Sequence, residues 1–591
     1  MLNRKDVPMN LKWKTEDMFE NLAEWNALFA KTEKRIDFAK YEGKLNTVET
    51  VKACFDELYS VMGDLELLGV YAYMKHDEDS RDSESSALLA RIDELEVRFS
   101  SAIAFMTPEL TALDISVLES FVNDPRLKDY DYEIKGIIKD KAHVLGKEAE
   151  GVLAMGGQVF SSFRNIFGMI NNADLPFPEI TVRGKKIKVS HGTYGVLMQD
   201  SDRAVRRKTF KAYYGAFIGL INTIAATYIA NVNKNVYISR VRKYESCLDR
   251  ALSSEDVYPE VYNNLIESVS AGMKTMHEYV AVRKKELGYK ELHMYDVYTP
   301  LVEGANLELD YEDAFKLVKE GLKPLGEEYG KLLQRAHDER WIDVEETDGK
   351  RSGAYSISVY KCAHPYVLLN YQKTTNDIFT IAHELGHAMH SYYSNTNQNV
   401  INANYTIMVA EVASTVNEII LGQYLIGKEK DKGKRAALIN TELDKLRATL
   451  IRQTMFAEFE KIVHEKVEND EQLTSDKLCD IYLELNKKYF GEDVIVDEEI
   501  KYEWARIPHF YSCFYVYKYA TGISAAIAIA KKILSGEKGF VEKYINMLKQ
   551  GCTKKSVDLL KMVDVDLESK KPYEDAFEFY KQNLDELNKI V

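Results

Sequence analysis

The chain has 591 residues, more than a single hydrophobic core usually supports, so we expect two or more lobes. Its formal net charge of −15 and the lack of a Lys/Arg block argue against a nucleic-acid partner and favour cationic over anionic ligands. Six scattered cysteines indicate neither a disulfide framework nor a CxxC metal site. The start lacks a signal-peptide core and no apolar run is long enough to span a bilayer, so we expect a cytoplasmic protein without a membrane partner.

The first 170 residues read mostly as helices. Between residues 88 and 103 apolar residues recur every three or four positions, which predicts one amphipathic helix. The segment 171–192 carries Pro176 and Pro178. After them, apolar and polar residues alternate on both sides of Arg183-Gly184, which predicts a β-hairpin over 180–189. We therefore place a domain boundary near residue 200, which divides the chain into 1–200 and 201–591.

Helical patterns resume after residue 200 and end at Arg340. The segments 341–344, 354–360 and 366–371 then predict three short strands of a small antiparallel sheet, with a turn at 347–350. Directly afterwards, Thr374 to Asp377 supply capping side chains and negative charge for a new helix. The predicted fold is mostly α, with a small sheet beside this helix.

The new helix carries His383-Glu384-Leu385-Gly386-His387. Residues four apart on a helix lie about 40° apart around it, so both imidazoles can bind one ion. Glu384 projects beside that ion, where a carboxylate can take a proton from bound water. Gly386 lets a second backbone approach closely. The pattern predicts one zinc ion per chain.

Zinc in a catalytic site needs a third protein ligand and one open position. His390 lies about 10 Å along the helix from His383, too far to share the ion. Position 393 is Tyr, so the metzincin spacing fails as well. The remaining candidate is Glu411 on a second predicted helix over 408–418, with Glu418 two turns further as an acceptor that orients a ligand histidine.

Other interpretations exist for each of these residues. Two histidines four apart also occur on ordinary solvated helices, and chance alone gives at most roughly 0.04 such patterns in this composition. Either glutamate taken singly fits a solvated helix face, and this alternative is especially open for Glu418.

With these residues laid out, the sequence resembles oligoendopeptidase F, in the thimet-oligopeptidase-like group of zinc metallopeptidases. The resemblance extends over nearly the whole chain. Four separated matches in the same order make it far more specific than one pentapeptide. They are the stretches Lys350–Ser356, Thr380–His390, Ala410–Glu418 and Arg506–Gly522.

The resemblance implies an amino-terminal helical lobe over 1–200 and a zinc metallopeptidase domain over 201–591, enclosing a deep substrate channel. It implies cleavage of short peptides inside cells, with the strand at Gly353-Ala354-Tyr355 pairing with substrate backbone. An exposed strand edge offers N–H and C=O groups to any extended peptide. One departure is Ser512-Cys513, where relatives often carry an aromatic residue and a proline.

The expected mechanism is hydrolysis by a zinc-bound water that Glu384 activates. We expect His509 and Tyr517 to donate to the oxyanion, two turns apart if the helix has begun. Tyr515 would point about 160° away and contact substrate. Two alternatives stay open for this cluster: Tyr515 is the donor, or the tyrosines only pack.

The nearest alternative function is a zinc carboxypeptidase or dipeptidase on a related helical scaffold, which differs in how it holds a substrate terminus. An alternative from another class is a peptide-binding scaffold protein with a degenerate site. The intact set of His383, Glu384, His387 and Glu411 argues against the scaffold. The sequence predicts neither the oligomeric state nor the side-chain preference at the cleaved bond.

Overall fold

The computed structural model describes residues 2–302 and 307–591. They form two compact units, each built from three separate stretches of chain. Unit 1 comprises 2–144, 307–424 and 529–565, and unit 2 comprises 145–302, 425–528 and 566–591. Both units draw residues from either side of position 200, so the predicted domain boundary stays a prediction.

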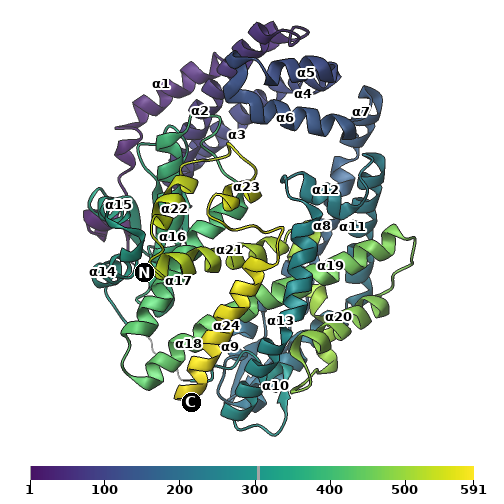
Figure 1. Cartoon of the computed structure of the whole chain (residues 1–591), viewed down its shortest axis with the longest axis vertical. Helices are drawn as coiled ribbons and strands as arrows, with labels where there is room; N and C mark the ends of the chain where they lie inside the picture. The colour runs from purple at the N-terminus through teal and green to yellow at the C-terminus, as the bar shows by residue number, and fades with distance from the viewer. Residues whose placement is uncertain (1, 303–306) are drawn as a thin grey trace. The chain divides into compact units, whose positions relative to one another are not determined.

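Helices dominate unit 1, as predicted (Figure 1). Its strands, within the described residues, form one small sheet. The elements wholly or partly in this unit are α1 (Leu22–Glu33), α2 (Val48–Glu78), α3 (Ser83–Ile103), α4 (Met106–Ala112), α5 (Ile115–Val122), α6 (Asp131–Asp140), α14 (Tyr311–Gly321), α15 (Glu327–Asp338), β4 (Ile342–Glu345), β5 (Tyr355–Ile357), β6 (Tyr366–Tyr371), α16 (Thr375–Asn397), α17 (Ile407–Lys428), α21 (Tyr517–Leu534), α22 (Phe540–Leu548) and α23 (Ser556–Lys561).

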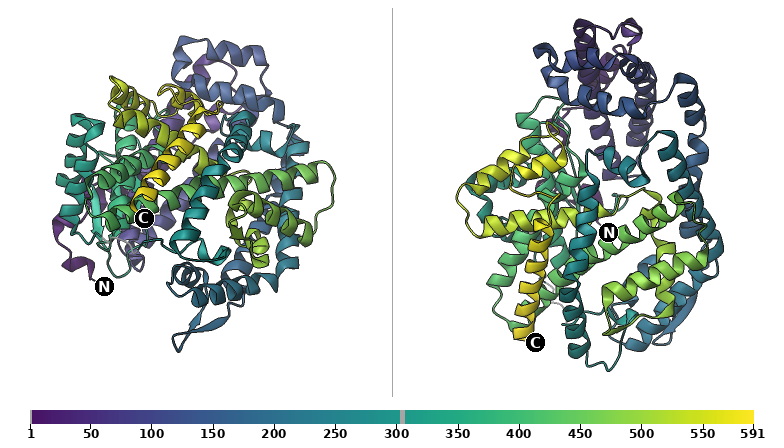
Figure 2. Two further views of the ribbon diagram at one scale, coloured as in Figure 1. Left: turned by 60° about the horizontal axis from the view of Figure 1, so that its bottom comes forward. Right: turned by 45° about the vertical axis from the view of Figure 1, so that its right-hand side comes forward.

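Unit 2 is also mainly helical, and α24 runs beside α13 in both Figure 1 and Figure 2. Its β1–β2 pair is antiparallel and confirms the predicted hairpin, while β3 and β7 pair in parallel. Its remaining elements are α7 (Lys147–Met155), α8 (Gly157–Met169), β1 (Glu179–Val182), β2 (Lys185–Lys188), α9 (His191–Leu197), α10 (Arg203–Ile218), α11 (Ile221–Val241), α12 (Cys247–Ser253), α13 (Pro259–Glu286), β3 (Leu292–His293), α18 (Lys432–Leu446), α19 (Arg452–Glu468), α20 (Ser475–Phe490), β7 (Val494–Ile495) and α24 (Lys571–Ile590).

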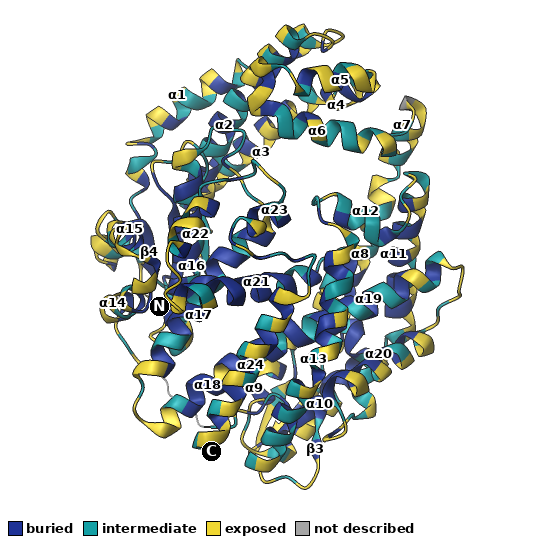
Figure 3. Cartoon of the chain, viewed as in Figure 1, coloured by how far each residue is buried: buried dark blue, intermediate teal, exposed yellow. Residues whose placement is uncertain are grey.

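Amphipathic patterning explains the helices. Along α3 the predicted apolar stripe is buried at Leu88, Ile92, Leu95 and Phe99, and Asp82 caps the helix by accepting from the Ser85 N–H. Figure 3 shows the same alternation of buried and exposed residues along α24. Because one face of each helix is apolar, each helix must bury that face against a neighbour.

The three-stranded sheet differs from the prediction in one respect. Its order is β4-β6-β5, with β5 antiparallel to β6 but β4 parallel to it. The predicted all-antiparallel arrangement is therefore wrong. The predicted turn at 347–350 is confirmed, since the Lys350 N–H donates to the Thr347 C=O at 3.2 Å, but it does not join two paired strands as a hairpin. The segment instead bonds to the end of α2 and the residues after it, through Ser80 N–H to Gly349 C=O at 2.8 Å and Arg351 N–H to Asp77 C=O at 3.0 Å.

The sheet and α16 are fixed to each other and to α2. A buried cluster packs α2 against β6 through Val70, Met74, Tyr366 and Leu368. The predicted start of α16 is confirmed, since Thr374 and Asp377 bond reciprocally in a capping box. These contacts place the histidine-bearing helix directly behind the sheet.

No single helix within 2–302 and 307–591 combines the length and apolar character that a membrane span needs. Two bent helix pairs pass by length and composition together, Ser83–Ala112 with Ile115–Val122 and Arg203–Ile218 with Ile221–Val241.

Candidate functional site

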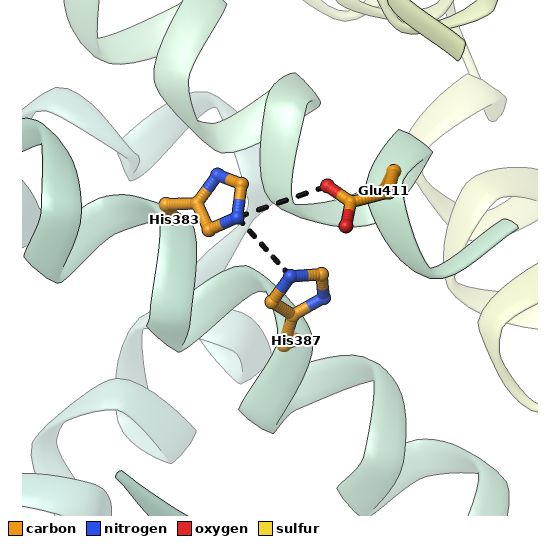
Figure 4. A group of neighbouring side chains, drawn as sticks. All are labelled: His383, His387 and Glu411. Carbon is orange, nitrogen blue, oxygen red and sulfur yellow. Dashed lines mark hydrogen bonds and ion pairs between the residues drawn. The ribbon is translucent and has the colours of Figure 1, made fainter. Parts of the chain in front are cut away.

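Helices α16 and α17 bring three ligand-type side chains of unit 1 together (Figure 4). Ligand atoms of His383, His387 and Glu411 all lie within 4.8 Å of one another. The Nε2 atom of His383 is 3.2 Å from Nε2 of His387 and 3.8 Å from Oε2 of Glu411. Two nitrogens that share a tetrahedral zinc at about 2.0–2.1 Å are about 3.3 Å apart, so the histidine pair already has this spacing.

The hydrogen-bond partner at the other ring nitrogen determines whether the Nε2 atom of each imidazole can bind a metal. Nδ1 of His383 lies 2.5 Å from Oε1 of Glu418, and His387 hydrogen-bonds to the backbone carbonyl of Ala410. Because the Glu418 carboxylate accepts, the neutral His383 ring carries its proton on Nδ1 and turns an unprotonated Nε2 toward Nε2 of His387. A cation between them would satisfy both lone pairs, so the donor set fits a metal such as zinc.

The pKa values of the two histidines shift in opposite directions. Burial lowers the pKa of His383, but the hydrogen bond and charge of Glu418 outweigh burial, so this pKa is raised. Burial and the charge of His383 lower the pKa of His387 to about 3. Burial raises the pKa of Glu411. A neutral His387 is the form that binds metal.

Glu384 projects from α16 toward strand β5, where it bonds to the Ser356 backbone. Its side chain is buried, at 7% exposure, and its Oε2 atom has no hydrogen-bond partner. Burial raises the pKa of Glu384 to about 7, while a hydrogen bond from the Ser356 backbone N–H opposes this shift. A carboxyl group with a pKa near the working pH is suited to accept and return a proton.

Close packing of α17 on α16 fixes the site, and it includes contacts that the sequence did not indicate. A Cβ on Gly386 would lie 2.6 Å from the Ser414 Cα, so the predicted close approach is confirmed. Asn417 donates to the Ala382 carbonyl at 3.0 Å and accepts from the Tyr329 hydroxyl at 3.0 Å. Only contacts between distant segments could identify Tyr329, because its own stretch carries no motif.

His390 does not take part in the ligand cluster. It is buried, at 2% exposure, and its ring stacks on that of Tyr405 with centroids 3.7 Å apart. The Tyr405 hydroxyl lies 2.6 Å from that of Ser391. The exclusion of His390 as a ligand agrees with this position, and its role is to pack the end of the loop before α17 against α16.

The predicted substrate strand offers fewer free groups than expected. Asn370 Nδ2 donates to the carbonyl of Gly353 at 2.7 Å, and the Tyr355 hydroxyl donates to Asp77 at 2.8 Å. Because the Ser356 N–H points at Glu384, residues 354 and 356 face away from β6, where β5 forms the edge of the sheet. The outward backbone groups are therefore those of Ser356 in β5 and of Ala354 just before it.

Unit 2 holds the other predicted residues in a separate cluster. The Tyr519 hydroxyl lies 3.4 Å from Nε2 of His509, and the ring of Tyr515 stacks on the histidine with centroids 6.0 Å apart. Tyr517 is 1% exposed, packs on Tyr262 and has a hydroxyl without a hydrogen-bond partner. The expected shared face of His509 and Tyr517 is therefore wrong, because α21 begins only at Tyr517 and helical spacing does not apply before it.

The segment around Ser512-Cys513 follows an unusual path. Phe514 adopts a φ of +51°, and its N–H donates at 2.7 Å to Glu460, a buried carboxyl on α19. Burial raises the pKa of Glu460 to about 8. This anchor, absent from any sequence motif, determines where the chain runs between His509 and α21.

The chain is similar to known peptidases. The model of peptidase family M3 matches residues 196–579, and a model described as oligopeptidase F matches residues 109–177. Oligopeptidase PepF of Bacillus subtilis is 39% identical, over 100% of this chain and 88% of that protein. An oligoendopeptidase F homolog of Borreliella burgdorferi is 37% identical over 100% of both chains.

Similarity extends to solved structures. The crystal structure of oligoendopeptidase-F from Enterococcus faecium has a TM-score of 0.73 and 34% sequence identity, over 98% of this chain and 99% of that one. The family model covers the histidine pair, Glu411 and the segment 509–519 alike. The chain is therefore a metalloendopeptidase of peptidase family M3 and belongs to its oligoendopeptidase F group.

Proposed function

We propose that this chain hydrolyses internal bonds of short peptides with one zinc ion held by His383, His387 and Glu411. The observation that carries the proposal is the convergence of the His383 and His387 Nε2 atoms, 3.2 Å apart, with Oε2 of Glu411 3.8 Å from the first of them. Glu418 is the orienting acceptor of His383. A site with three such donors and one open position is typical of catalytic zinc.

Glu384 acts as the general base and then as the general acid. When bound, zinc supplies Lewis-acid chemistry, since it polarises a carbonyl and lowers the pKa of water. Glu384 takes a proton from the attacking water on Oε2, its unpartnered oxygen, and returns that proton to the leaving amine. The Ser356 N–H holds the carboxylate in place during both transfers.

The substrate is an extended peptide that pairs with the outward groups of Ala354 and Ser356 at the edge strand β5. We further propose that the enzyme accepts short peptides and excludes folded proteins, and that it works in the cytoplasm. Support comes from the names of its relatives, which are called oligopeptidases or oligoendopeptidases.

His509 and a neighbouring tyrosine are proposed as donors to the oxyanion and the adjoining substrate backbone. The hydroxyl-to-imidazole contact of Tyr519 with His509 makes Tyr519 a better candidate than the buried Tyr517, with Tyr515 as the substrate contact. Burial lowers the pKa of His509, so the ring is neutral at pH 7 and one nitrogen can donate.

The metal requirement is tested by chelation. A chelator should abolish peptide hydrolysis, and one equivalent of zinc per chain should restore it. Glu411→Ala should lose metal affinity, measured as zinc content after dialysis against buffer containing a weak chelator. Full activity in metal-free protein would contradict the proposal.

Endopeptidase action is tested with blocked peptides. A peptide acetylated at its amino end and amidated at its carboxyl end should be cut internally, as read by mass spectrometry. Removal of single terminal residues from unblocked peptides only would instead indicate a carboxypeptidase or dipeptidase.

A further inference from the structure

The segment that leads into the substrate strand is held by the end of helix α2. Asp77 is 3% exposed, and its Oδ2 atom accepts from the Tyr355 hydroxyl at 2.8 Å and from Arg351 Nη1 at 3.3 Å. Its backbone carbonyl also accepts the Arg351 N–H at 3.0 Å. One buried carboxylate thus joins α2 to both ends of the short stretch 351–355.

Neighbouring contacts fix the turn just before this stretch. Arg81 bonds to the Asp348 carboxylate at 2.7 Å, and Gly349 has a φ of +87° that a side chain would oppose. A Cβ on Gly349 would also lie 2.2 Å from Oδ1 of Asp79. From the sheet side, Asn370 donates to the carbonyls of Arg351 and Gly353 at 2.8 and 2.7 Å.

These two sets of contacts determine which groups of β5 remain available. The Gly353 carbonyl accepts a hydrogen bond from Asn370, and the Tyr355 hydroxyl donates one to Asp77. The backbone of Ala354 and the carbonyl of Ser356 face outward, and the Ser356 N–H faces Glu384. A shift of the strand by a fraction of a hydrogen-bond length would move the peptide and Glu384 relative to each other.

We propose that Asp77 is a positioning residue for peptide hydrolysis: through Tyr355 and Arg351 it holds strand β5 where Ala354 and Ser356 can pair with a substrate beside Glu384. The inference rests on the proposed function of β5 as the peptide-binding edge. Asp77 itself touches neither the substrate nor the ligand histidines. Its action is entirely through the strand.

The test compares variants in metal-loaded full-length enzyme. Asp77→Ala should raise KM for a blocked peptide by about tenfold, because the charged hydrogen bonds to Asp77 are of a strength that corresponds to roughly this factor. Asp77→Asn keeps an acceptor for the Tyr355 hydroxyl and should lose less. Tyr355→Phe removes only that hydroxyl, and it keeps the inference testable if Asp77→Ala fails to fold.

Two further measurements separate positioning from stability. If Asp77 only stabilised the fold, the variants would contain fewer active molecules of unchanged KM, with zinc content reduced in proportion. A raised KM at full zinc content supports positioning, and combining Asp77→Asn with Tyr355→Phe should then give less than the sum of the single effects.

The matched control is Asp56→Ala. Asp56 lies on the same helix and bonds to a tyrosine hydroxyl and a lysine, Tyr130 and Lys52, but not to β5. It should leave KM unchanged. An unchanged KM in both Asp77→Ala and Tyr355→Phe would overturn the inference while leaving the proposed function intact; absence of metal-dependent peptide cleavage by the unmodified enzyme would instead overturn the proposed function.

Discussion

Glu384 and Glu460 occupy similar environments in different units, yet their neighbours differ. Each is buried, each has a backbone N–H as hydrogen-bond partner, from Ser356 and Phe514 respectively, and each leaves Oε2 without a partner. Burial raises their pKa values to about 7 and about 8. A perturbed pKa alone would therefore rank both residues as catalytic candidates.

The surroundings separate the two. Glu384 has the ligand-type residues His383 and Glu411 beside it. It also faces β5, which is an edge strand of its sheet. Near Glu460, His464 is itself buried with a pKa lowered to about 4, and its Nδ1 bonds to the Glu460 backbone carbonyl. Glu460 is thus a neutral anchor for the loop at Phe514, whereas Glu384 is placed to exchange a proton.

The largest expected difference is in catalysis. Glu384→Gln should lower kcat by at least about a hundredfold, since it removes the proton acceptor. Its zinc content should stay at one per chain. Glu460→Gln should change kcat by less than about threefold, because glutamine resembles the neutral acid already present. Both are measured with a blocked peptide and metal analysis.

Equal losses of kcat in the two glutamine variants would break this comparison. Loss of zinc from Glu384→Gln would show that Glu384 is a ligand rather than a base.

A smaller effect is expected at the start of α21, which follows the loop that Glu460 anchors. Tyr519→Phe should lower kcat by about tenfold with little change in KM, as for a donor to charge that develops in the transition state. Tyr517→Phe should leave kcat unchanged and raise or preserve the melting temperature, because it removes a buried hydroxyl without a partner. Steady-state kinetics and thermal unfolding distinguish the two.

A large kcat loss in Tyr517→Phe at unchanged melting temperature would restore Tyr517 as the donor. If neither substitution affects kcat, the tyrosines only pack.

The last expected effect is on stability rather than on catalysis, and it depends on pH. The pKa of Glu460 is raised on folding, so its contribution to stability is fully present below its unfolded value of about 4.5 and is lost as pH rises toward about 8. The loss is at most about 1.4 kcal/mol per pH unit. Wild type should therefore lose stability relative to Glu460→Gln between pH 5 and 8, measured by urea unfolding. Parallel stability profiles would show that Glu460 is ionised in the folded protein.

Local geometry explains which predictions succeeded. The four-residue spacing of His383 and His387, the cap at Thr374 and the close approach at Gly386 depend only on helix geometry, which the sequence encodes within a few residues. The hairpin over 179–188 likewise follows from alternation and a turn. The same reasoning failed for Tyr517, because the helix that it assumed near His509 begins only at Tyr517, about two turns later.

The sequence by itself determined the chemistry of this protein: a His-Glu-x-x-His helix, a glutamate on a second helix and a mostly helical fold. Only the tertiary structure decided which way the strands pair, that Tyr519 rather than Tyr517 meets His509, and that Asp77 bonds to Tyr355 of β5. The reason is physical. Ligand spacing and capping are set by nearby residues along one helix, whereas Asp77 and Tyr355 are 278 positions apart and meet only when the core packs.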